Sequence, residues 1–160
     1  MAIDDLLQNN AAYAATFAKS DLPPIPALRV AVLTCMDARI DVHRILGVEE
    51  GGVHVIRNAG GLVTEDAVRS LLLSQKVLAT REVLVIQHTG CGMLNLPEQE
   101  IKRELERELG AAPEFELGAF TDLHDSVRRA VATIKQTPFL HDSVRGFVYD
   151  VTTGGLQEVT

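Results

Sequence analysis

The residues of this chain best suited to metal chemistry are two cysteines and a histidine, which lie at the ends of two apolar runs. The segment LTCMDARIDV (33–42) contains Cys35, and the segment VLVIQHTGCGM (83–93) contains His88 and Cys91. Two thiols and an imidazole suit zinc, and three protein ligands with one open position are typical of a catalytic zinc site. We therefore predict a zinc (Zn2+) site with these three residues as ligands.

A carboxylate and a guanidinium follow the first cysteine, at Asp37 and Arg39. Arg39 can hold the Asp37 carboxylate through charge-assisted hydrogen bonds. The held carboxylate could accept a hydrogen bond from a water molecule on the metal and orient it. Asp37 could instead take the fourth metal position itself, which would close the site. The sequence leaves both arrangements open.

Each of these residues has a simpler explanation when it is considered alone. An isolated cysteine commonly packs as a small buried hydrophobe, and an isolated histidine is more often a hydrogen-bonded core residue than a ligand. The two cysteines could also form a redox pair, which a reducing compartment disfavours. The joint placement at two predicted strand ends favours the metal site. For the remaining histidines, we expect His54 to be packed within a strand and His43, His124 and His141 to lie at the surface.

Length and composition restrict the class of protein. A chain of 160 residues suits a single domain, and 46% hydrophobic residues with 23% charged residues are ordinary for a globular protein. The formal net charge of -7 argues against a nucleic-acid partner, because phosphate binding depends on clustered Lys and Arg. The amino-terminal segment lacks the basic and apolar regions of a signal peptide, and no apolar run reaches the roughly 20 residues of a membrane span. We expect a cytoplasmic protein without a membrane partner.

The elements that must position the candidate ligands alternate between strands and helices. The apolar, β-branched runs predict strands at 28–33, 53–57 and 82–88, and the segment 145–159 predicts a strand, a Gly-Gly turn and a last short strand. Helical spacing predicts helices at 4–18, 41–46, 65–79, 97–109 and 120–136. This order indicates an α/β domain around a mainly parallel sheet, with an antiparallel strand at its end. In such folds the ligand site lies at the carboxyl ends of the strands, where the cysteines and His88 fall.

Three motifs resemble those of one enzyme family. CMDAR resembles the C-x-D-x-R motif of β-class carbonic anhydrases, HTGCG resembles their H-x-x-C motif, and RNAGG at 57–61 resembles their segment after the second strand. The resemblance extends over nearly the whole chain. It implies that Cys35, His88 and Cys91 are zinc ligands and that Asp37 and Arg39 are a catalytic dyad.

The resemblance also implies a fold, an activity and an assembly. The fold would be a single domain over 1–160, with a four-stranded parallel sheet and helices on both faces. The activity would be the reversible hydration of carbon dioxide to bicarbonate and a proton through zinc-bound hydroxide. Residues 1–26 would be a dimerisation arm that lies across a partner subunit, and the assembly would be a homodimer or a dimer of dimers. Alternatives with the same zinc ligands are a hydrolase of carbonyl sulfide or carbon disulfide and a non-catalytic zinc protein.

Overall fold

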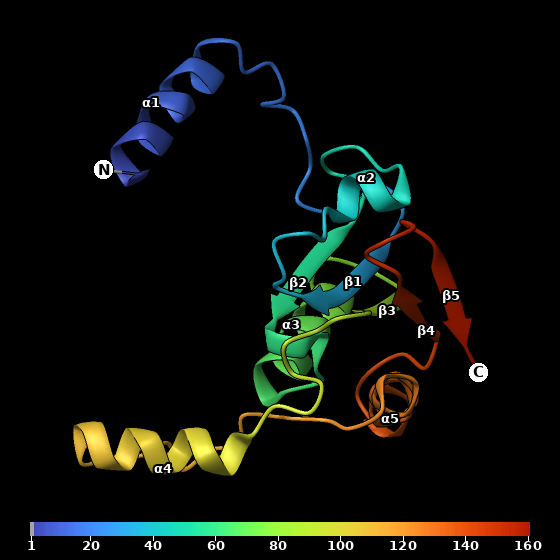
Figure 1. The fold of residues 1–160 in the computed structure, drawn as a ribbon. Helices are drawn as coiled ribbons and strands as arrows, with labels where there is room; N and C mark the ends of the chain where they lie inside the picture. The colour runs from blue at the N-terminus through green and yellow to red at the C-terminus, as the bar shows by residue number, and fades with distance from the viewer. Residues whose placement is uncertain (1) are drawn as a thin grey trace.

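The computed structural model describes residues 2–160, and a single five-stranded sheet organises them (Figure 1). The elements follow in the order α1 (Ala2–Ala15), β1 (Val30–Cys35), α2 (Val42–Leu46), β2 (His54–Asn58), the 3-10 turn η1 (Ala59–Gly61), α3 (Glu65–Lys76), β3 (Glu82–His88), α4 (Glu98–Leu109), α5 (Leu123–Gln136), β4 (Val144–Tyr149) and β5 (Leu156–Val159). The spatial order of the strands is β2-β1-β3-β4-β5. The first four strands are parallel and β5 is antiparallel to β4, as predicted.

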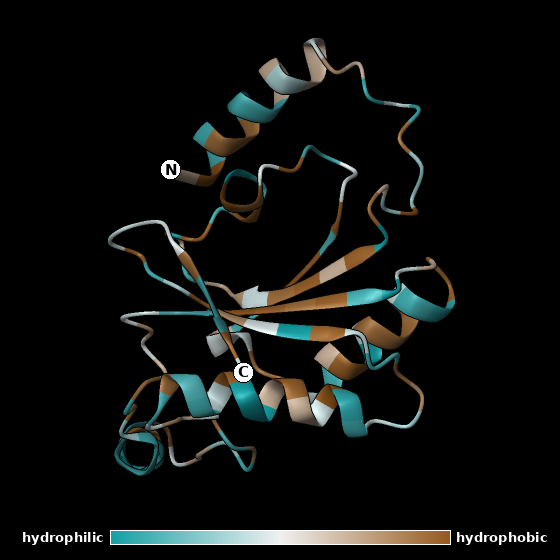
Figure 2. Cartoon of the chain, turned by 90° about the vertical axis from the view of Figure 1, so that its right-hand side faces the viewer, coloured by the Kyte–Doolittle hydropathy of each residue, from teal (hydrophilic) through white to brown (hydrophobic). Residues whose placement is uncertain are grey.

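Helices lie on both faces of the sheet, and the apolar layers between them form the core (Figures 1 and 2). On one face, Leu71 of α3 and Ile134 of α5 pack with Val83 and Val85 of β3. On the other face, Val42 of α2 belongs to a second apolar cluster that also contains Cys35 and Cys91. The packing of the second face therefore helps to hold the candidate metal ligands.

The first two strands begin and end later in the chain than the apolar runs predicted. Strand β1 starts at Val30 because Arg29 adopts a left-handed backbone with a φ of 57°. It continues through Thr34 because the buried hydroxyl of Thr34 donates a hydrogen bond to the Ile86 carbonyl oxygen at 2.8 Å. The strand therefore reaches Cys35, which the prediction had placed two residues beyond its end.

The amino-terminal helix projects away from the sheet (Figure 1). Helix α1 has no buried residue, and it ends at Ala15, earlier than the predicted residue 18. Among residues 2–160, no helix combines the length and the apolar character that a membrane crossing requires.

Candidate metal centre

The structure brings the three predicted ligands together. Cys35 is the last residue of β1, His88 is the last residue of the neighbouring strand β3, and Cys91 lies in the turn that follows. All three side chains are buried, and their potential ligand atoms lie within 4.8 Å of one another. Parallel neighbours end at the same edge of a sheet, so the two apolar runs place thiol, imidazole and thiol side by side.

The protonation and burial of His88 fit a metal ion. Its Nδ1 lies 3.0 Å from the Thr89 carbonyl oxygen, which can only accept, so Nδ1 carries the proton and Nε2 presents a lone pair. His88 Nε2 is buried and has no hydrogen-bond partner within residues 2–160. A buried polar atom without a partner is costly unless a ligand satisfies it. This orphaned nitrogen beside two thiols fits a soft divalent cation such as zinc.

In the absence of a cation, the buried surroundings favour the neutral forms of the candidate ligands. Burial raises the pKa of the Cys91 thiol, and the nearby Cys35 thiol raises it further. Burial also lowers the pKa of His88. A divalent cation reverses this preference for the thiols, because a metal-coordinating thiol is deprotonated. Both cysteines are free, which leaves both sulfur atoms available as ligands.

Asp37 and Arg39 form a closely bonded pair beside this cluster. Arg39 donates from Nε to Asp37 Oδ1 at 2.9 Å and from Nη2 to Asp37 Oδ2 at 2.7 Å. The Arg39 guanidinium holds the pKa of the Asp37 carboxyl well below its usual range, so the group is ionised. Asp37 Oδ2 lies 3.7 Å from His88 Nε2, and Arg39 Nη2 also donates to the Gly90 carbonyl oxygen at 3.1 Å. The pair is therefore linked to the turn that carries Cys91 and faces the ligand cluster.

The RNAGG segment (57–61) forms a second layer around Cys35. The Gly60 N–H donates to Cys35 Sγ at 3.3 Å, and the Asn58 carbonyl oxygen accepts from the Met36 N–H at 2.9 Å. Gly61 has a φ of 62°, and a Cβ there would lie 2.9 Å from the Thr34 carbonyl carbon. The sequence showed only two glycines after a strand, and it did not reveal that the second of them, Gly61, packs against the end of β1.

The other histidines lie where the sequence predicted. Half-buried His54 is packed, with Nδ1 at 2.8 Å from Ser74 Oγ and Nε2 at 3.1 Å from the Pro24 carbonyl oxygen. His43, His124 and His141 are exposed. None of these four residues belongs to the ligand cluster, which the structure confines to Cys35, His88 and Cys91 within the described residues.

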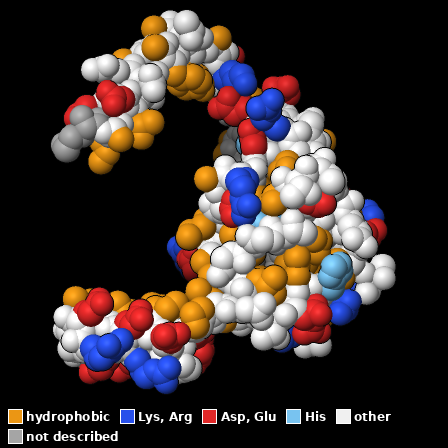
Figure 3. Space-filling model, viewed as in Figure 1, with side chains coloured by type: hydrophobic (Ala, Val, Ile, Leu, Met, Phe, Trp, Pro, Cys, Tyr) orange, Lys and Arg blue, Asp and Glu red, His pale blue; other side chains and the backbone are white. Residues whose placement is uncertain are grey.

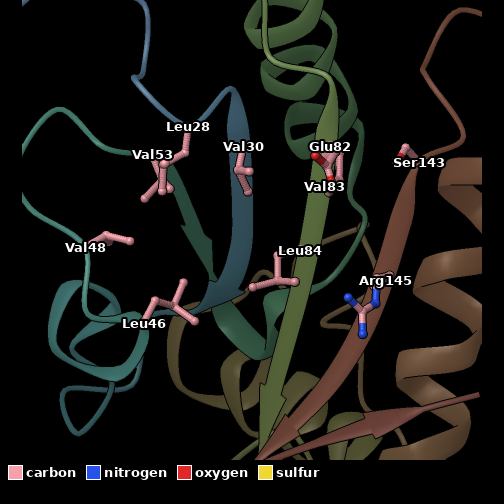
Figure 4. Close-up of a pocket in the computed structure, with 10 residues that line it drawn as sticks. All are labelled: Leu28, Val30, Leu46, Val48, Val53, Glu82, Val83, Leu84, Ser143 and Arg145. Carbon is pink, nitrogen blue, oxygen red and sulfur yellow. The ribbon is translucent and has the colours of Figure 1, made fainter.

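An apolar pocket of about 220 Å³ lies away from the ligand cluster, toward the amino ends of the strands (Figure 4). Val30, the first residue of β1, and Val83, the second residue of β3, line it, whereas the ligands lie at the opposite ends of these strands. The full lining is Leu28, Val30, Leu46, Val48, Val53, Glu82, Val83, Leu84, Ser143 and Arg145. This set contains no thiol or imidazole, so the pocket is not the candidate site of chemistry.

Comparisons with known proteins agree with this geometry. The family model described as carbonic anhydrase matches residues 30–156. Beta-carbonic anhydrase 1 of Mycobacterium tuberculosis is 47% identical over 159 residues, which cover 98% of this chain and 97% of that protein. The crystal structure of carbonic anhydrase from Streptococcus mutans superposes with a TM-score of 0.93 at 37% identity, covering 100% of this chain and 98% of that one. A carbon disulfide hydrolase of Acidithiobacillus thiooxidans is 32% identical, over 81% of this chain and 76% of that protein.

Proposed function

Because the chain belongs to the β-carbonic anhydrase family, we propose that it catalyses the reversible hydration of carbon dioxide to bicarbonate and a proton. The observation that carries this proposal is the buried cluster of two thiols and one imidazole, with the ionised Asp37–Arg39 pair beside it. Zinc is the metal that the family uses and that this ligand set suits.

We propose that Cys35, His88 and Cys91 hold the metal. When bound, zinc supplies Lewis acidity that makes a water molecule easier to ionise. The Thr89 carbonyl oxygen orients the His88 ring and keeps Nε2 free for coordination. The Gly60 N–H donates to Cys35 Sγ, which favours the thiolate over the thiol and fixes the direction of the sulfur.

Asp37 and Arg39 would act on the water rather than on the metal. With both of its oxygens bonded to Arg39, the Asp37 carboxylate faces the cluster in one fixed orientation. It can accept a hydrogen bond from the attacking water and so direct the remaining lone pair of that water toward carbon dioxide. Since its pKa is low, Asp37 stays ionised at neutral pH, and the proton that the reaction releases must leave by another acceptor.

A stopped-flow assay of carbon dioxide hydration tests the activity. The zinc-loaded protein should accelerate hydration over buffer between about pH 7 and 9, where enzymes that ionise a bound water near neutrality operate. The same preparation should be offered carbonyl sulfide and carbon disulfide, with release of hydrogen sulfide as the readout. Hydrogen sulfide release without carbon dioxide hydration would support the hydrolase alternative. Stoichiometric zinc without either activity would support the non-catalytic alternative.

We also propose that the arm 1–26 binds a second copy of this chain, although Met1 lies outside the described residues. Helix α1 buries none of its side chains within the chain, and it exposes Ile3, Leu6 and Leu7 at 67%, 64% and 63%. Figure 3 shows apolar side chains on the arm that carries α1, at one end of a hollow, with further apolar side chains along α4 at the other end. An apolar helix face without intrachain contacts suits a partner surface.

The assembly can be tested by sedimentation. The wild-type chain should sediment as a dimer or larger species, whereas Leu6→Asp combined with Leu7→Asp should give a monomer. A monomeric wild type would contradict the arm proposal. The unpaired outer edge of β5 would allow dimers to pair into tetramers, which the same experiment would reveal. A cytoplasmic location remains a prediction from the sequence.

A further inference from the structure

We propose that Arg57 is a positioning residue for Asp37: its guanidinium fixes the backbone from Cys35 to Asp37, so that the Asp37 carboxylate stays on Arg39 instead of reaching the ligand cluster. The inference rests on the proposed function, because it assigns Arg57 to the control of the proposed dyad. It concerns a residue of β2 that contributes no atom to the ligand cluster and does not touch the Asp37 carboxylate in the structure.

The contacts of Arg57 are two hydrogen bonds to backbone carbonyl oxygens. Its Nε donates to the Cys35 carbonyl oxygen at 3.0 Å, and its Nη2 donates to the Asp37 carbonyl oxygen at 2.8 Å. The two carbonyl groups flank Met36, whose N–H donates to the Asn58 carbonyl oxygen at 2.9 Å. One planar guanidinium therefore holds two carbonyl groups that lie two residues apart, a geometry that the single ammonium of lysine cannot reproduce.

The Asp37 end of this segment has little other backbone support. Met36 is 66% exposed and lies beyond the end of β1, and the bond from its N–H to the Asn58 carbonyl oxygen still ties it to β2. Within residues 2–160, the Asp37 carbonyl oxygen accepts, besides Arg57, only the Ile40 N–H, at 3.0 Å, from within the same turn. Arg57 is thus the link that ties the Asp37 backbone to β2, outside its own turn.

The guanidinium of Arg57 binds these carbonyl groups rather than a carboxylate side chain. Arg57 is exposed, yet across residues 2–160 it forms no ion pair. An arginine on a strand end commonly points into solvent or pairs with a carboxylate. Here both of its hydrogen-bonding nitrogens are used on the backbone of the dyad segment.

If the Asp37 backbone were free to move, its carboxylate could leave Arg39 and reach the ligand cluster. Asp37 Oδ2 is already 3.7 Å from His88 Nε2, so a small rotation would bring it to the ligand cluster. Arg39 binds the carboxylate of Asp37, and Arg57 binds the backbone carbonyl oxygen of the same residue. Removal of Arg57 should therefore shift Asp37 from orienting water toward occupying the metal position.

A double-mutant cycle tests whether Arg57 acts through Asp37. Arg57→Met keeps the aliphatic stem and removes the donors, and we compare it with wild type and with the same change made in an Asp37→Ala background. In the wild-type background we expect kcat to fall roughly 10- to 100-fold with little change in KM, the usual effect of losing an outer-shell partner. In the Asp37→Ala background we expect no further loss, because the residue through which Arg57 acts is gone.

The visible spectrum of the cobalt(II)-substituted protein provides a second readout that does not depend on activity. Arg57→Met should change the cobalt spectrum when Asp37 is present and leave it unchanged in the Asp37→Ala background. Arg57→Lys, with one donor site in place of two, should lie between wild type and Arg57→Met in both readouts. Arg69→Met, at an arginine of α3 whose side chain is 70% exposed, is the matched control and should behave as wild type.

Three results would overturn the inference. One is a wild-type kcat and cobalt spectrum for Arg57→Met. Another is an equal loss in both backgrounds, which would show that Arg57 only supports the fold. The third, for use if Arg57→Met does not fold, is a wild-type kcat and cobalt spectrum for Arg57→Lys. A zinc-loaded wild type without hydratase activity would refute the proposed function, and the cobalt spectra would still decide whether Arg57 controls Asp37.

Discussion

Replacing Gly61 by alanine tests whether the close packing of the RNAGG segment against the end of β1 requires a glycine at this position. Gly61 has a φ of 62°, a conformation that costs an L-residue about 1–2 kcal/mol. The added Cβ would lie 2.9 Å from the Thr34 carbonyl carbon, 3.0 Å from the Cys35 nitrogen and 3.2 Å from the Ile86 carbonyl oxygen. These are backbone atoms of two paired strands, so they cannot move aside separately.

The crowding should add about 1–3 kcal/mol, as overpacking does in well-packed cores. The total loss of unfolding free energy is then about 2–5 kcal/mol. For a chain of 160 residues, 1 kcal/mol shifts Tm by roughly 2–4 °C, so Gly61→Ala should lower Tm by roughly 4–20 °C. Displacement of the segment should also weaken the Gly60 N–H bond to Cys35 Sγ and lower zinc affinity roughly 10- to 100-fold.

The assay is thermal unfolding by circular dichroism, together with a zinc titration, at one fixed protein concentration. Gly110→Ala is the matched control, because Gly110 also has a positive φ, 72°, but nothing lies within 4 Å of its Cβ position. The control carries only the backbone cost of about 1–2 kcal/mol and should retain wild-type zinc affinity. If Gly61→Ala lost no more stability than Gly110→Ala, the contact between the RNAGG segment and β1 would not be the constraint described above.

Further changes test the ligands, the dyad and the acid stability. Cys35→Ser should lower bound zinc, measured by elemental analysis, together with hydratase activity. Asp37→Ala should keep stoichiometric zinc but lose most of kcat, and an unchanged kcat would contradict the dyad. The Leu117 N–H bond to Glu98 is the main cause that lowers the pKa of Glu98 from 4.5 to about 2. A lowered folded-state pKa stabilises the fold above the unfolded pKa, so this contribution is lost as pH falls from 4.5 toward 2. Glu98→Gln should therefore flatten the acid side of the stability curve in urea titrations.

The grouping of the candidate metal ligands could be predicted because it depends on topology alone. Cys35 and His88 close two apolar runs, and parallel strands bring such ends to one edge. The predicted strand ended one residue before Thr34, because a polar side chain interrupts the apolar run there. In the structure the Thr34 hydroxyl donates to the Ile86 carbonyl oxygen, so the strand continues. That contact joins residues far apart in the chain, and no local pattern contains it.

The second layer could not be predicted, for a related reason. Arg57 looks like an ordinary solvent-facing residue at a strand end, and only the pairing of β2 with β1 directs its guanidinium to the Cys35 and Asp37 carbonyl groups. The contact of Gly61 with Thr34 likewise requires knowing that η1 turns back over β1. Sequence patterns identify groups that do chemistry, whereas the groups that hold them depend on tertiary register.

The charge of the proposed ligand set gives a reason why Asp37 would need to be restrained by both Arg39 and Arg57. In the proposed site, two thiolates would cancel the charge of a divalent cation and neutral His88 would add none, so the metal would be a milder Lewis acid than one held by three histidines. In the proposed mechanism, orientation of the water by Asp37 would then have to supply a larger share of the catalysis, and a carboxylate can orient water only while it is kept off the metal. Arg39 restrains the carboxylate and Arg57 restrains the backbone of the same residue. Because both restraints act through Asp37, removing Arg39 or Arg57 should lower kcat. Removing both together should raise the activation free energy by less than the sum of the two separate increases.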